Sequence, residues 1–509
     1  MKKIAVLILV VLIFVGCTSV ELPTPVPAIS HYQIVNVNVV DVINSKIINA
    51  QDVEVQNGII VSMLPHLSSG SNNAPILTID GTEQFLIPGL WDFHGVLNQL
   101  SPYIDYPLYI AHGITSLRSI LNCPNEDEVS IYPCMAEKFT WNTQVANGSL
   151  VGPRIAGSGT FPINGKSMLH PDSPSFHGGG SVADAIKIVE HYAEFQPELR
   201  PYSLKVYNNL SKDSYLALAA SARDAGFDIS GHKPRAVRID EAITAGQRSF
   251  AHARLFLYEC SVLKQELSEG QYWQLPLPEF YRLLLNNVDE ESCQSIMQNM
   301  AANNVYLSPT LLTRRNDYLA VADKQELVQG LDYAHYMFAR EWDEDIGKLK
   351  ADIKTEEDVQ TMLLFYQAAS KSIGEAHRNG VKIMAGTDSY DIYVVPGFSI
   401  HEEMLLLHEA GLGNFDVLRA ATLNTASYFG VQEKYGSIDK GKVADMVLLQ
   451  ENPISDIKNT TTIQTVFHGR QIYSQAAIGG LKQHAKTLAN SHRVTQKLIW
   501  LFLQNPTGF

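Results

Sequence analysis

The chain has 509 residues, of which 45% are hydrophobic and 18% charged, and this composition excludes a disordered chain and a coiled coil. The formal net charge is −14 and the sequence has no basic run, so we expect no nucleic-acid partner. At roughly 100–200 residues per domain, the length fits two to four domains, or one large barrel with additions.

The N-terminus has the pattern of a targeting signal. Two lysines precede an apolar run over residues 4–15, which is too short to span a bilayer and is typical of a signal peptide. The run ends in Gly16 followed by Cys17, which resembles a bacterial lipobox. This resemblance implies a signal peptide over residues 1–16, lipidation of Cys17, and a periplasmic or outer-membrane lipoprotein of the bacterial cell envelope. A plain secretory signal and an uncleaved anchor are the alternatives.

Four cysteines follow Cys17. Export places them in an oxidising compartment, where an even number of cysteines suggests disulfides. Local pairing would join Cys123 to Cys134 and Cys260 to Cys293, and we favour it among the three possible pairings. Free buried thiols are the alternative.

Both ends of the folded region have β character. After a tether rich in proline and threonine over residues 17–30, residues 31–87 form short β-type runs with a turn at Asn57-Gly58. Residues 436–475 return to β character. Strands from both ends can pair, so we predict one small β-sandwich domain built from residues 31–87 and 434–480.

The tail over residues 481–509 is predicted to be helical, with one helix over residues 482–503. We expect its Leu498, Leu501 and Leu503 to pack on the rest of the protein. A helix lying on a lipid surface is the alternative.

Between the β-rich ends, residues 88–433 alternate short β-type runs with longer helical patterns. The eight runs cover residues 90–94, 114–120, 154–157, 203–207, 228–232, 249–253, 305–311 and 382–388. The clearest helical patterns cover residues 181–195, 212–225, 240–245 and 355–379. Eight βα repeats predict an α/β protein with a (β/α)8 TIM barrel. Residues 255–304 form a larger, mostly helical insertion.

Polar residues stand at the same end of five predicted barrel strands, which is the end where barrel active sites form. They are His94, Lys205, His232, His252 and Asp388. One such residue alone is usually structural, but five on separate strands favour a site. Imidazole and carboxylate groups are ligands that suit zinc and other first-row ions.

Several motifs occur in an order that resembles the amidohydrolase superfamily, and most its exported imidazolonepropionase-like and Xaa-Pro-dipeptidase-like members. They are LIPGLWDFH at residues 86–94, GTDS at 386–389, PGFSIHEE at 396–403, AATLNTA at 420–426, GSI at 436–438 and KGKVAD at 440–445. The resemblance covers about residues 32–475.

The resemblance implies a role for each strand-end residue. His94, Lys205, His232, His252 and Asp388 would be metal ligands. Lys205 would take up CO2 to form a carbamate, and Asp388 would also be the catalytic proton shuttle. A lysine reacts with CO2 only as the neutral amine, and burial favours that form. A buried or solvated strand lysine without CO2 is the alternative.

One position departs from the family pattern. The superfamily has His-x-His on the first strand, but this chain has His94-Gly95-Val96, and valine cannot bind a metal. We therefore predict one well-held Zn2+ at Lys205, His232 and His252, with a second ion, at His94 and Asp388, weak or absent.

Other residues could replace the missing histidine, but their spacing places none of them at the site. They are Asn98, His112, His170 and His177. His170 and His177 fall in a loop rich in glycine, proline and serine over residues 164–180, which we expect to cover the pocket. Solvated loop histidines are the alternative.

Tyr207, Lys233 and Arg235 follow the ligand strands and are candidates to bind a substrate carboxylate, with plain surface solvation as the alternative. The sequence thus predicts a metal-dependent hydrolase of carbon–nitrogen bonds in small amides, dipeptides or cyclic amides, which acts through metal-activated water. Its membrane contact would be only through the lipid. The alternative is a non-catalytic binding or scaffold lipoprotein that retains the barrel, because of Val96.

Overall fold

The computed structural model of the protein describes residues 20–67, 77–166 and 177–505. The predicted signal peptide, the lipidation residue Cys17 and the loop residue His170 lie outside the described residues, and they stay predictions.

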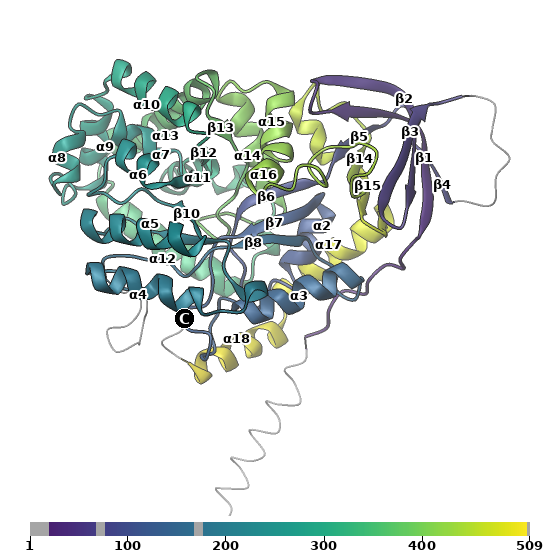
Figure 1. Ribbon diagram of the computed structural model, residues 1–509, viewed down its shortest axis with the longest axis horizontal. Helices are drawn as coiled ribbons and strands as arrows, with labels where there is room; N and C mark the ends of the chain where they lie inside the picture. The colour runs from purple at the N-terminus through teal and green to yellow at the C-terminus, as the bar shows by residue number, and fades with distance from the viewer. Residues whose placement is uncertain (1–19, 68–76, 167–176, 506–509) are drawn as a thin grey trace, which may run out of the picture.

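The strands from the two ends of the chain form one mixed sheet, at the right of Figure 1. Its strands are β1 His31–Asp41, β2 Lys46–Gln56, β3 Ile59–Pro65, β4 Leu77–Asp80, β5 Phe85–Pro88, β14 Asp445–Leu449, β15 Ile463–His468 and β16 Gln471–Ser474. The order is β16-β15-β14-β5-β1-β2-β3, with β4 beside β1. The antiparallel pair of β5 and β14 joins the two ends of the chain.

This sheet folds over on itself around its own core. The Ile60 amide donates a hydrogen bond to the Lys442 carbonyl (2.9 Å), and the Ala444 amide donates one to the Gly58 carbonyl (2.9 Å). These bonds link β3 to the segment before β14. The enclosed apolar side chains include Tyr32, Ile34, Val39, Val53, Leu86, Met446 and Phe467. The terminal strands thus pair as predicted, but in a single folded sheet rather than two separate ones.

The eight barrel strands overlap the eight predicted runs. They are β6 Leu90–Gly95, β7 Ile114–Ser119, β8 Arg154–Ser158, β9 Ser203–Val206, β10 Asp228–Gly231, β11 Gln247–Ala251, β12 Tyr306–Ser308 and β13 Lys382–Ile383. They form two parallel sheets, one from β6 to β8 and one from β9 to β13. Parallel neighbours in chain order are what a βα repeat produces.

Backbone hydrogen bonds connect these two sheets at both seams. The Tyr202 amide donates to the Ser158 carbonyl (2.8 Å) between β9 and β8. The Phe93 amide donates to the Ala385 carbonyl (2.9 Å) between β6 and the segment after β13. Neither seam is a continuous ladder, so hydrogen bonds link the two sheets at both edges without closing them into one unbroken barrel.

Helices cover the outside of the ring (Figure 1). They are α2 Asp105–Ala111, α3 Met135–Asn147, α4 Val182–Ala193, α5 Lys212–Ala225, α6 Ile239–Ala245, α11 Leu311–Val321, α12 Tyr336–Asp352, α13 Glu356–Arg378, α14 Phe398–Glu409, α15 Asn414–Ala420 and α16 Leu423–Tyr428. Side-chain N-caps set several starts: Ser181, Ser211 and Thr355 each accept a hydrogen bond from the amide three residues on.

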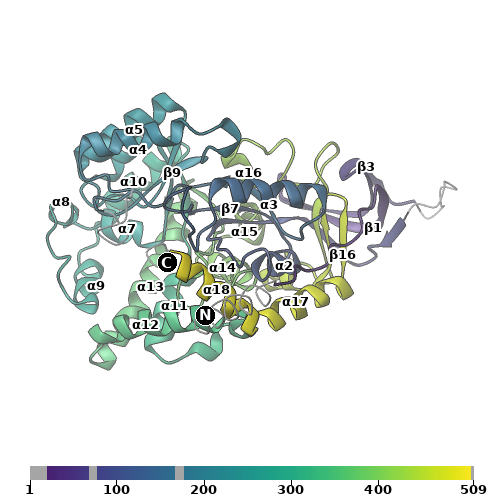
Figure 2. The same ribbon diagram turned by 90° about the horizontal axis from the view of Figure 1, so that it is seen from below.

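The predicted insertion, residues 255–304, contributes four helices at the end of the molecule opposite the terminal sheet (Figures 1 and 2). These are α7 Arg254–Glu259, α8 Lys264–Ser268, α9 Leu277–Leu285 and α10 Glu290–Ala302. A disulfide between Cys260 and Cys293 ties the end of α7 to α10, and a second joins Cys123 to Cys134. These are the two local pairs that the sequence favours.

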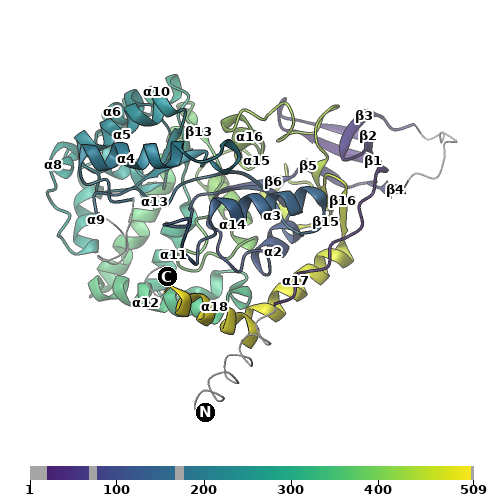
Figure 3. The same cartoon turned by 60° about the horizontal axis from the view of Figure 1, so that its bottom comes forward.

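The C-terminal tail forms two helices, α17 Gln475–Ala489 and α18 His492–Gln504, which follow one another along the lower edge of Figure 3. The prediction of one helix was wrong, because Asn490 ends the first and the Ser491 hydroxyl caps the second. Leu498 is buried as expected, whereas Leu503 is 63% exposed and does not pack. No helix in the described ranges combines the length and apolarity needed to cross a membrane.

The seam at β6 leaves no room for a side chain on Gly386. A Cβ atom there would lie 2.5 Å from Ser308 Oγ and 2.7 Å from His94 Cβ. We expect Gly386→Ala to lower the free energy of unfolding by about 1–3 kcal/mol, because the close-packed interior cannot absorb the methyl group. Urea unfolding followed by circular dichroism measures this loss.

Gly347 in α12 provides the matched control, since a Cβ there meets nothing within 4 Å. Gly347→Ala should raise stability by roughly 0.5–1 kcal/mol through helix propensity. Equal stability of Gly386→Ala and the wild type would contradict the close seam.

Candidate metal centre and active site

A buried carboxylate ties the end of the first barrel strand to the segment after the eighth. Asp92 accepts hydrogen bonds from the amide of His94 (3.0 Å), the amide of Thr387 (3.0 Å) and the Thr387 hydroxyl (2.6 Å). Burial raises the pKa of Asp92 to about 6, although these hydrogen bonds favour the charged form. The Asp388 amide also donates to the His94 carbonyl (2.7 Å). His94 and Asp388 are thereby held side by side.

Three of the five predicted ligands converge at this point. His94 Nε2 lies 3.3 Å from Asp388 Oδ1, and His252 Nδ1 lies 3.7 Å from Asp388 Oδ2. One candidate ligand atom from each residue lies within 4.8 Å of the other two. His94 Nε2 is buried and makes no hydrogen bond of good geometry in the described part of the chain, and its contact with Asp388 Oδ1 is an ion-pair contact at 3.3 Å. Buried polar atoms normally have partners, so this nitrogen indicates a ligand site.

The electrostatics of the three residues suit a cation. Burial would raise the pKa of Asp388, but nearby His94 and Lys205 outweigh it and lower that pKa, so the carboxylate is charged. Burial lowers the pKa of both His94 and His252, so both imidazoles are neutral. Neutral imidazole and charged carboxylate are the protonation states in which these groups bind metals. Asp388 keeps 21% of its side chain exposed and so can also meet a substrate.

His232 adds a fourth group beside the three. Its Nδ1 contacts Asn208 Oδ1 at 2.8 Å, and an amide oxygen only accepts, so Nδ1 carries the hydrogen. In the neutral ring this leaves Nε2 as a bare lone pair, 2.9 Å from His252 Nε2. Two ring nitrogens at this distance need a proton or a cation between them. Asn208 thus fixes the orientation of this predicted ligand, in the way that hydrogen-bond partners of metal-binding histidines do.

Lys205 lies in β9 and is buried. Its Nζ makes no hydrogen bond or ion pair with any residue that the structure describes. Burial lowers the pKa of Lys205 to about 8; Asp388 opposes this shift and the buried cation of Arg118 adds to it. A substantial neutral fraction near neutral pH is what a reaction with CO2 requires.

The backbone is strained at three residues of the site. His252 has φ 74°, Thr310 φ 43° and Asp388 φ 61°, all in the left-handed region. Each such residue costs about 1–2 kcal/mol when it is not glycine. The Thr310 hydroxyl contacts His252 Nδ1 at 2.9 Å, so the strained positions lie together. Strain of this kind clusters at functional sites.

None of the described candidates to replace the missing histidine joins this group. Val96 is half-buried in the loop after β6. Asn98 Oδ1 accepts a hydrogen bond from the Leu100 amide (2.7 Å) and so shapes that loop. His112 packs against the Phe398 ring, and His177 Nε2 contacts the Tyr192 hydroxyl (2.6 Å). The alternative interpretation, a solvated loop histidine, is wrong for His177, because this residue is buried.

The three residues predicted to contact a substrate differ in whether their side chains are already paired within the protein. Tyr207 stacks on His232 with ring centroids 4.1 Å apart. The Lys233 ammonium pairs with Glu259 (3.0 Å), so its charge is compensated and we no longer expect it to bind a substrate. Arg235 lies 3.7 Å above the Trp273 ring and keeps its positive charge without a carboxylate partner in the described ranges.

Sequence reasoning missed Arg254, which stands two residues after His252. Burial lowers the pKa of His232 and the Arg254 cation adds to that shift; Arg254 also adds to the larger effects of His94 and Lys205 that lower the pKa of Asp388. The charge of Arg254 therefore acts on the predicted ligands. The sequence signal for Arg254 is its position two residues after His252, at the predicted barrel mouth. A second cluster of ligand-type residues, Cys123, Glu126 and Cys134, is closed by its disulfide and offers no metal site.

Comparison with known proteins agrees with the resemblance seen in the motifs. Residues 284–472 match the model of the Amidohydrolase family, which confirms the resemblance for that part of the chain. No curated protein matches the chain.

Solved structures match over most of the chain. A bottromycin amidohydrolase is 20% identical with a TM-score of 0.67, and the match covers 91% of this chain and 92% of that one. A Xaa-Pro dipeptidase with bound methionine is 18% identical, TM-score 0.59, with coverage of 87% and 100%. A putative prolidase from Bifidobacterium longum is 19% identical, TM-score 0.58, with coverage of 90% and 100%. These likenesses confirm the predicted α/β fold, which this chain shares with hydrolases of known structure.

The lowered pKa of Lys205 predicts a pH dependence of CO2 uptake. Below about pH 8 the amine is increasingly protonated and cannot attack CO2, so uptake should fall as pH falls. Protein incubated with isotope-labelled bicarbonate should show more carbamate at about pH 8.5 than at about pH 6.5, by nuclear magnetic resonance. Lys205→Met is the control and should show none. The same signal in that variant would place the carbamate on another amine.

Proposed function

Because the chain has the amidohydrolase fold with ligand-type side chains at its strand ends, we propose that it is a metal-dependent hydrolase of carbon–nitrogen bonds in small amides. The observation that carries this proposal is the convergence of buried His94 and His252 with the partly exposed Asp388, whose candidate ligand atoms lie within 4.8 Å of one another. A purely structural barrel has no reason to bury two neutral imidazoles against a charged carboxylate, since each costs desolvation.

The residues fit a first-row ion such as zinc. His94, His252 and Asp388 would hold it, with His232 beside them and Lys205 as a carbamate. A bound ion would supply Lewis acidity that lowers the pKa of water and polarises a carbonyl. That one ion is held well and a second weakly stays a prediction. The three residues that converge come from both predicted sites, since His252 belongs to one and His94 and Asp388 to the other.

The chain's own residues supply the proton transfers. Asp388 is charged and reaches the barrel mouth, so it can accept the proton of the attacking water. The water oxygen bonds to the carbonyl carbon, the carbon–nitrogen bond breaks, and Asp388 returns the proton to the leaving nitrogen. On Lys205, the lone pair of the neutral amine would add to the carbon of CO2 and the nitrogen would release one proton to solvent, which turns a neutral amine into an anionic carbamate.

Dipeptides are the substrates that we propose first. The similar structures include a Xaa-Pro dipeptidase with bound methionine and a prolidase complexed with N-methylphosphonate-L-proline. Cyclic amides remain a further class from the sequence resemblance. A scaffold protein without catalysis is the second candidate, because Val96 removes one family ligand.

Asp388→Asn provides the test of the mechanism. The amide cannot accept a proton, so turnover of a dipeptide panel by the zinc-loaded protein should fall by roughly 10³-fold or more. Circular dichroism should remain that of the wild type. Asp439→Asn, an exposed change in the terminal sheet region, is the matched control and should keep full activity.

Two outcomes would overturn the proposal. Full turnover by Asp388→Asn would reject the role of this carboxylate. A wild-type protein that holds no metal after treatment with zinc and bicarbonate, measured by elemental analysis, would favour the scaffold.

We also propose that the protein is lipid-anchored at Cys17 in the bacterial cell envelope. Two disulfides support an exported protein. Val20, three residues after Cys17, packs against a cluster to which α2, α17 and α18 contribute. Cys17→Ser should move the expressed protein from the membrane to the soluble fraction; unchanged membrane retention of that variant would contradict lipid anchoring.

A further inference from the structure

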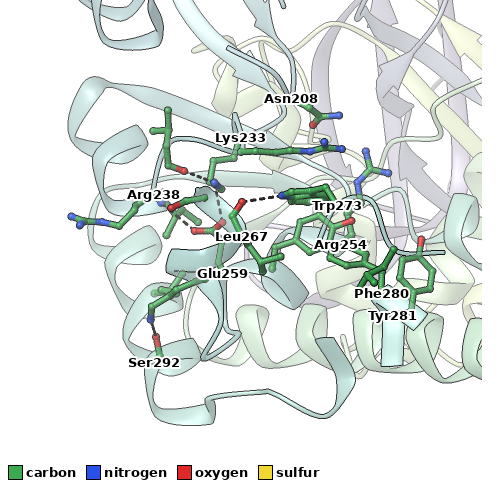
Figure 4. A pocket seen from close by; sticks show the side chains of 18 of the residues that line it. Asn208, Lys233, Arg238, Arg254, Glu259, Leu267, Trp273, Phe280, Tyr281 and Ser292 are labelled. Carbon is green, nitrogen blue, oxygen red and sulfur yellow. Dashed lines mark hydrogen bonds and ion pairs between the residues drawn. The ribbon is translucent and has the colours of Figure 1, made fainter. Parts of the chain in front are cut away.

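A cavity of about 760 Å³ lies between the barrel mouth and the insertion, next to the metal centre. Figure 4 shows Asn208 at one end of it and Ser292 of α10 at the other. Three of its lining residues lie close in sequence or space to the predicted ligands. Asn208 contacts His232. Arg235 follows His232 by three residues, and Arg254 follows His252 by two. None of the five strand-end residues lines the cavity, but Asn208 contacts His232 (2.8 Å), so the cavity adjoins the candidate metal centre.

The cavity carries more positive than negative charge. Six cationic and three acidic side chains line it: Lys233, Arg235, Arg238, Arg254, Lys264, Arg314, and Asp240, Glu259, Asp352. Glu259 pairs with Lys233 (3.0 Å) and Asp240 with Arg238 (2.9 Å).

The remaining charges leave a clear excess. Arg314 pairs with Asp317 outside the cavity lining (2.5 Å), and Asp352 accepts a hydrogen bond from the Leu277 amide (3.0 Å). Arg235 and Arg254 make no ion pair with any residue of the described ranges. In a chain of net charge −14, two uncompensated guanidinium groups in one cavity indicate an anionic ligand.

One wall of the same cavity is aromatic. Trp273 lies 4.9 Å from Phe280 and 5.3 Å from Tyr258, measured between ring centroids. The Trp273 indole nitrogen donates to the Leu267 carbonyl (2.9 Å), which fixes its ring. Figure 4 shows Trp273, Phe280 and Tyr281 along this wall. Arg235 lies over one face of the Trp273 ring (3.7 Å), so a cation and the aromatic wall meet here, which suits a ligand whose carboxylate adjoins an apolar body.

We propose that this cavity binds the leaving amino acid of the substrate, with its free α-carboxylate on Arg254 and Arg235 and a large apolar or aromatic side chain against Trp273 and Phe280. This rests on the proposed hydrolase function and names its substrate class: dipeptides or N-acyl amino acids that end in an aromatic or large apolar residue. Guanidinium groups suit the carboxylate because they can bind both of its oxygens.

The covalent structure of the insertion supports this assignment. The disulfide between Cys260 and Cys293 joins α7, which begins at Arg254, to α10, which lines the far side of the cavity. The arginine and the opposite wall are thereby held together. When the carbon–nitrogen bond breaks, the released amine nitrogen takes its proton from Asp388, and the amino acid remains in the cavity until it leaves.

The first experiment compares matched substrates of the zinc-loaded wild type: Ala-Phe, Ala-Phe amide and Ala-Gly. We expect kcat/KM for Ala-Phe to exceed that for the amide by on the order of 100-fold, because the amide lacks the charge that the arginines bind. Ala-Gly should be poorer than Ala-Phe by on the order of 10-fold, because it leaves the aromatic wall uncovered. Equal hydrolysis of Ala-Phe and its amide would overturn the inference and leave the proposed hydrolase function standing.

The second experiment removes the charge from Arg254. Arg254→Met keeps an unbranched side chain, so it should lose on the order of 100-fold on Ala-Phe and little on the amide. Arg238→Met is the matched control, since Arg238 lines the same cavity but pairs with Asp240, and it should keep the wild-type preference. A carboxylate preference that survives Arg254→Met would reject the assignment of this residue.

A binding measurement separates the cavity from catalysis. Phenylalanine should change the tryptophan fluorescence of the metal-free wild type, phenylalaninamide should not, and the Trp273→Phe and Arg254→Met variants should not respond. If no substrate is hydrolysed but phenylalanine binds in this manner, the hydrolase proposal fails and the cavity assignment holds. If phenylalanine and its amide bind equally or not at all, the cavity assignment fails.

Discussion

The buried carboxylate of Asp92 is the interaction on which the rest of the structure depends. It binds the backbone of His94 on the first barrel strand and the amide and hydroxyl of Thr387 after the eighth. The same three hydrogen bonds therefore support the closure of the barrel and place His94 beside Asp388. A buried charge is costly unless it is hydrogen-bonded, so Asp92 must accept bonds from the strands around it. Those same bonds fix the backbone on which His94 and Asp388 stand.

Much of the fold follows from the sequence because periodicity and caps are local properties. The helix over residues 212–225 has the predicted bounds, since Ser211 caps its start and Gly226 ends it with φ 79°. The break in the tail between Asn490 and Ser491 carries no glycine or proline, so local reasoning gave one helix where the protein has two. Whether the terminal strands form one sheet or two depends on pairings across the whole chain, and no local pattern contains that information.

The sequence predicts which residues form the site, but not how their atoms are arranged. Strand ends gather at one mouth of a barrel, so the sequence could name His94, His252 and Asp388 together. Which of their atoms meet depends on the left-handed backbone at His252 and Asp388, which L-residues rarely adopt. Charge compensation is likewise a tertiary property: Lys233 is paired with Glu259 from another element, whereas Arg254 makes no ion pair with any residue that the structure describes.

The metal-dependent hydrolase is tested most directly by a crystal structure of the protein grown with zinc and bicarbonate, with anomalous diffraction recorded at the zinc edge. We predict an anomalous peak in contact with His252 and Asp388, and carboxyl density extending from Lys205 Nζ. Histidines without an adjacent peak, and Lys205 ending in a bare amine, would contradict the metal-dependent hydrolase.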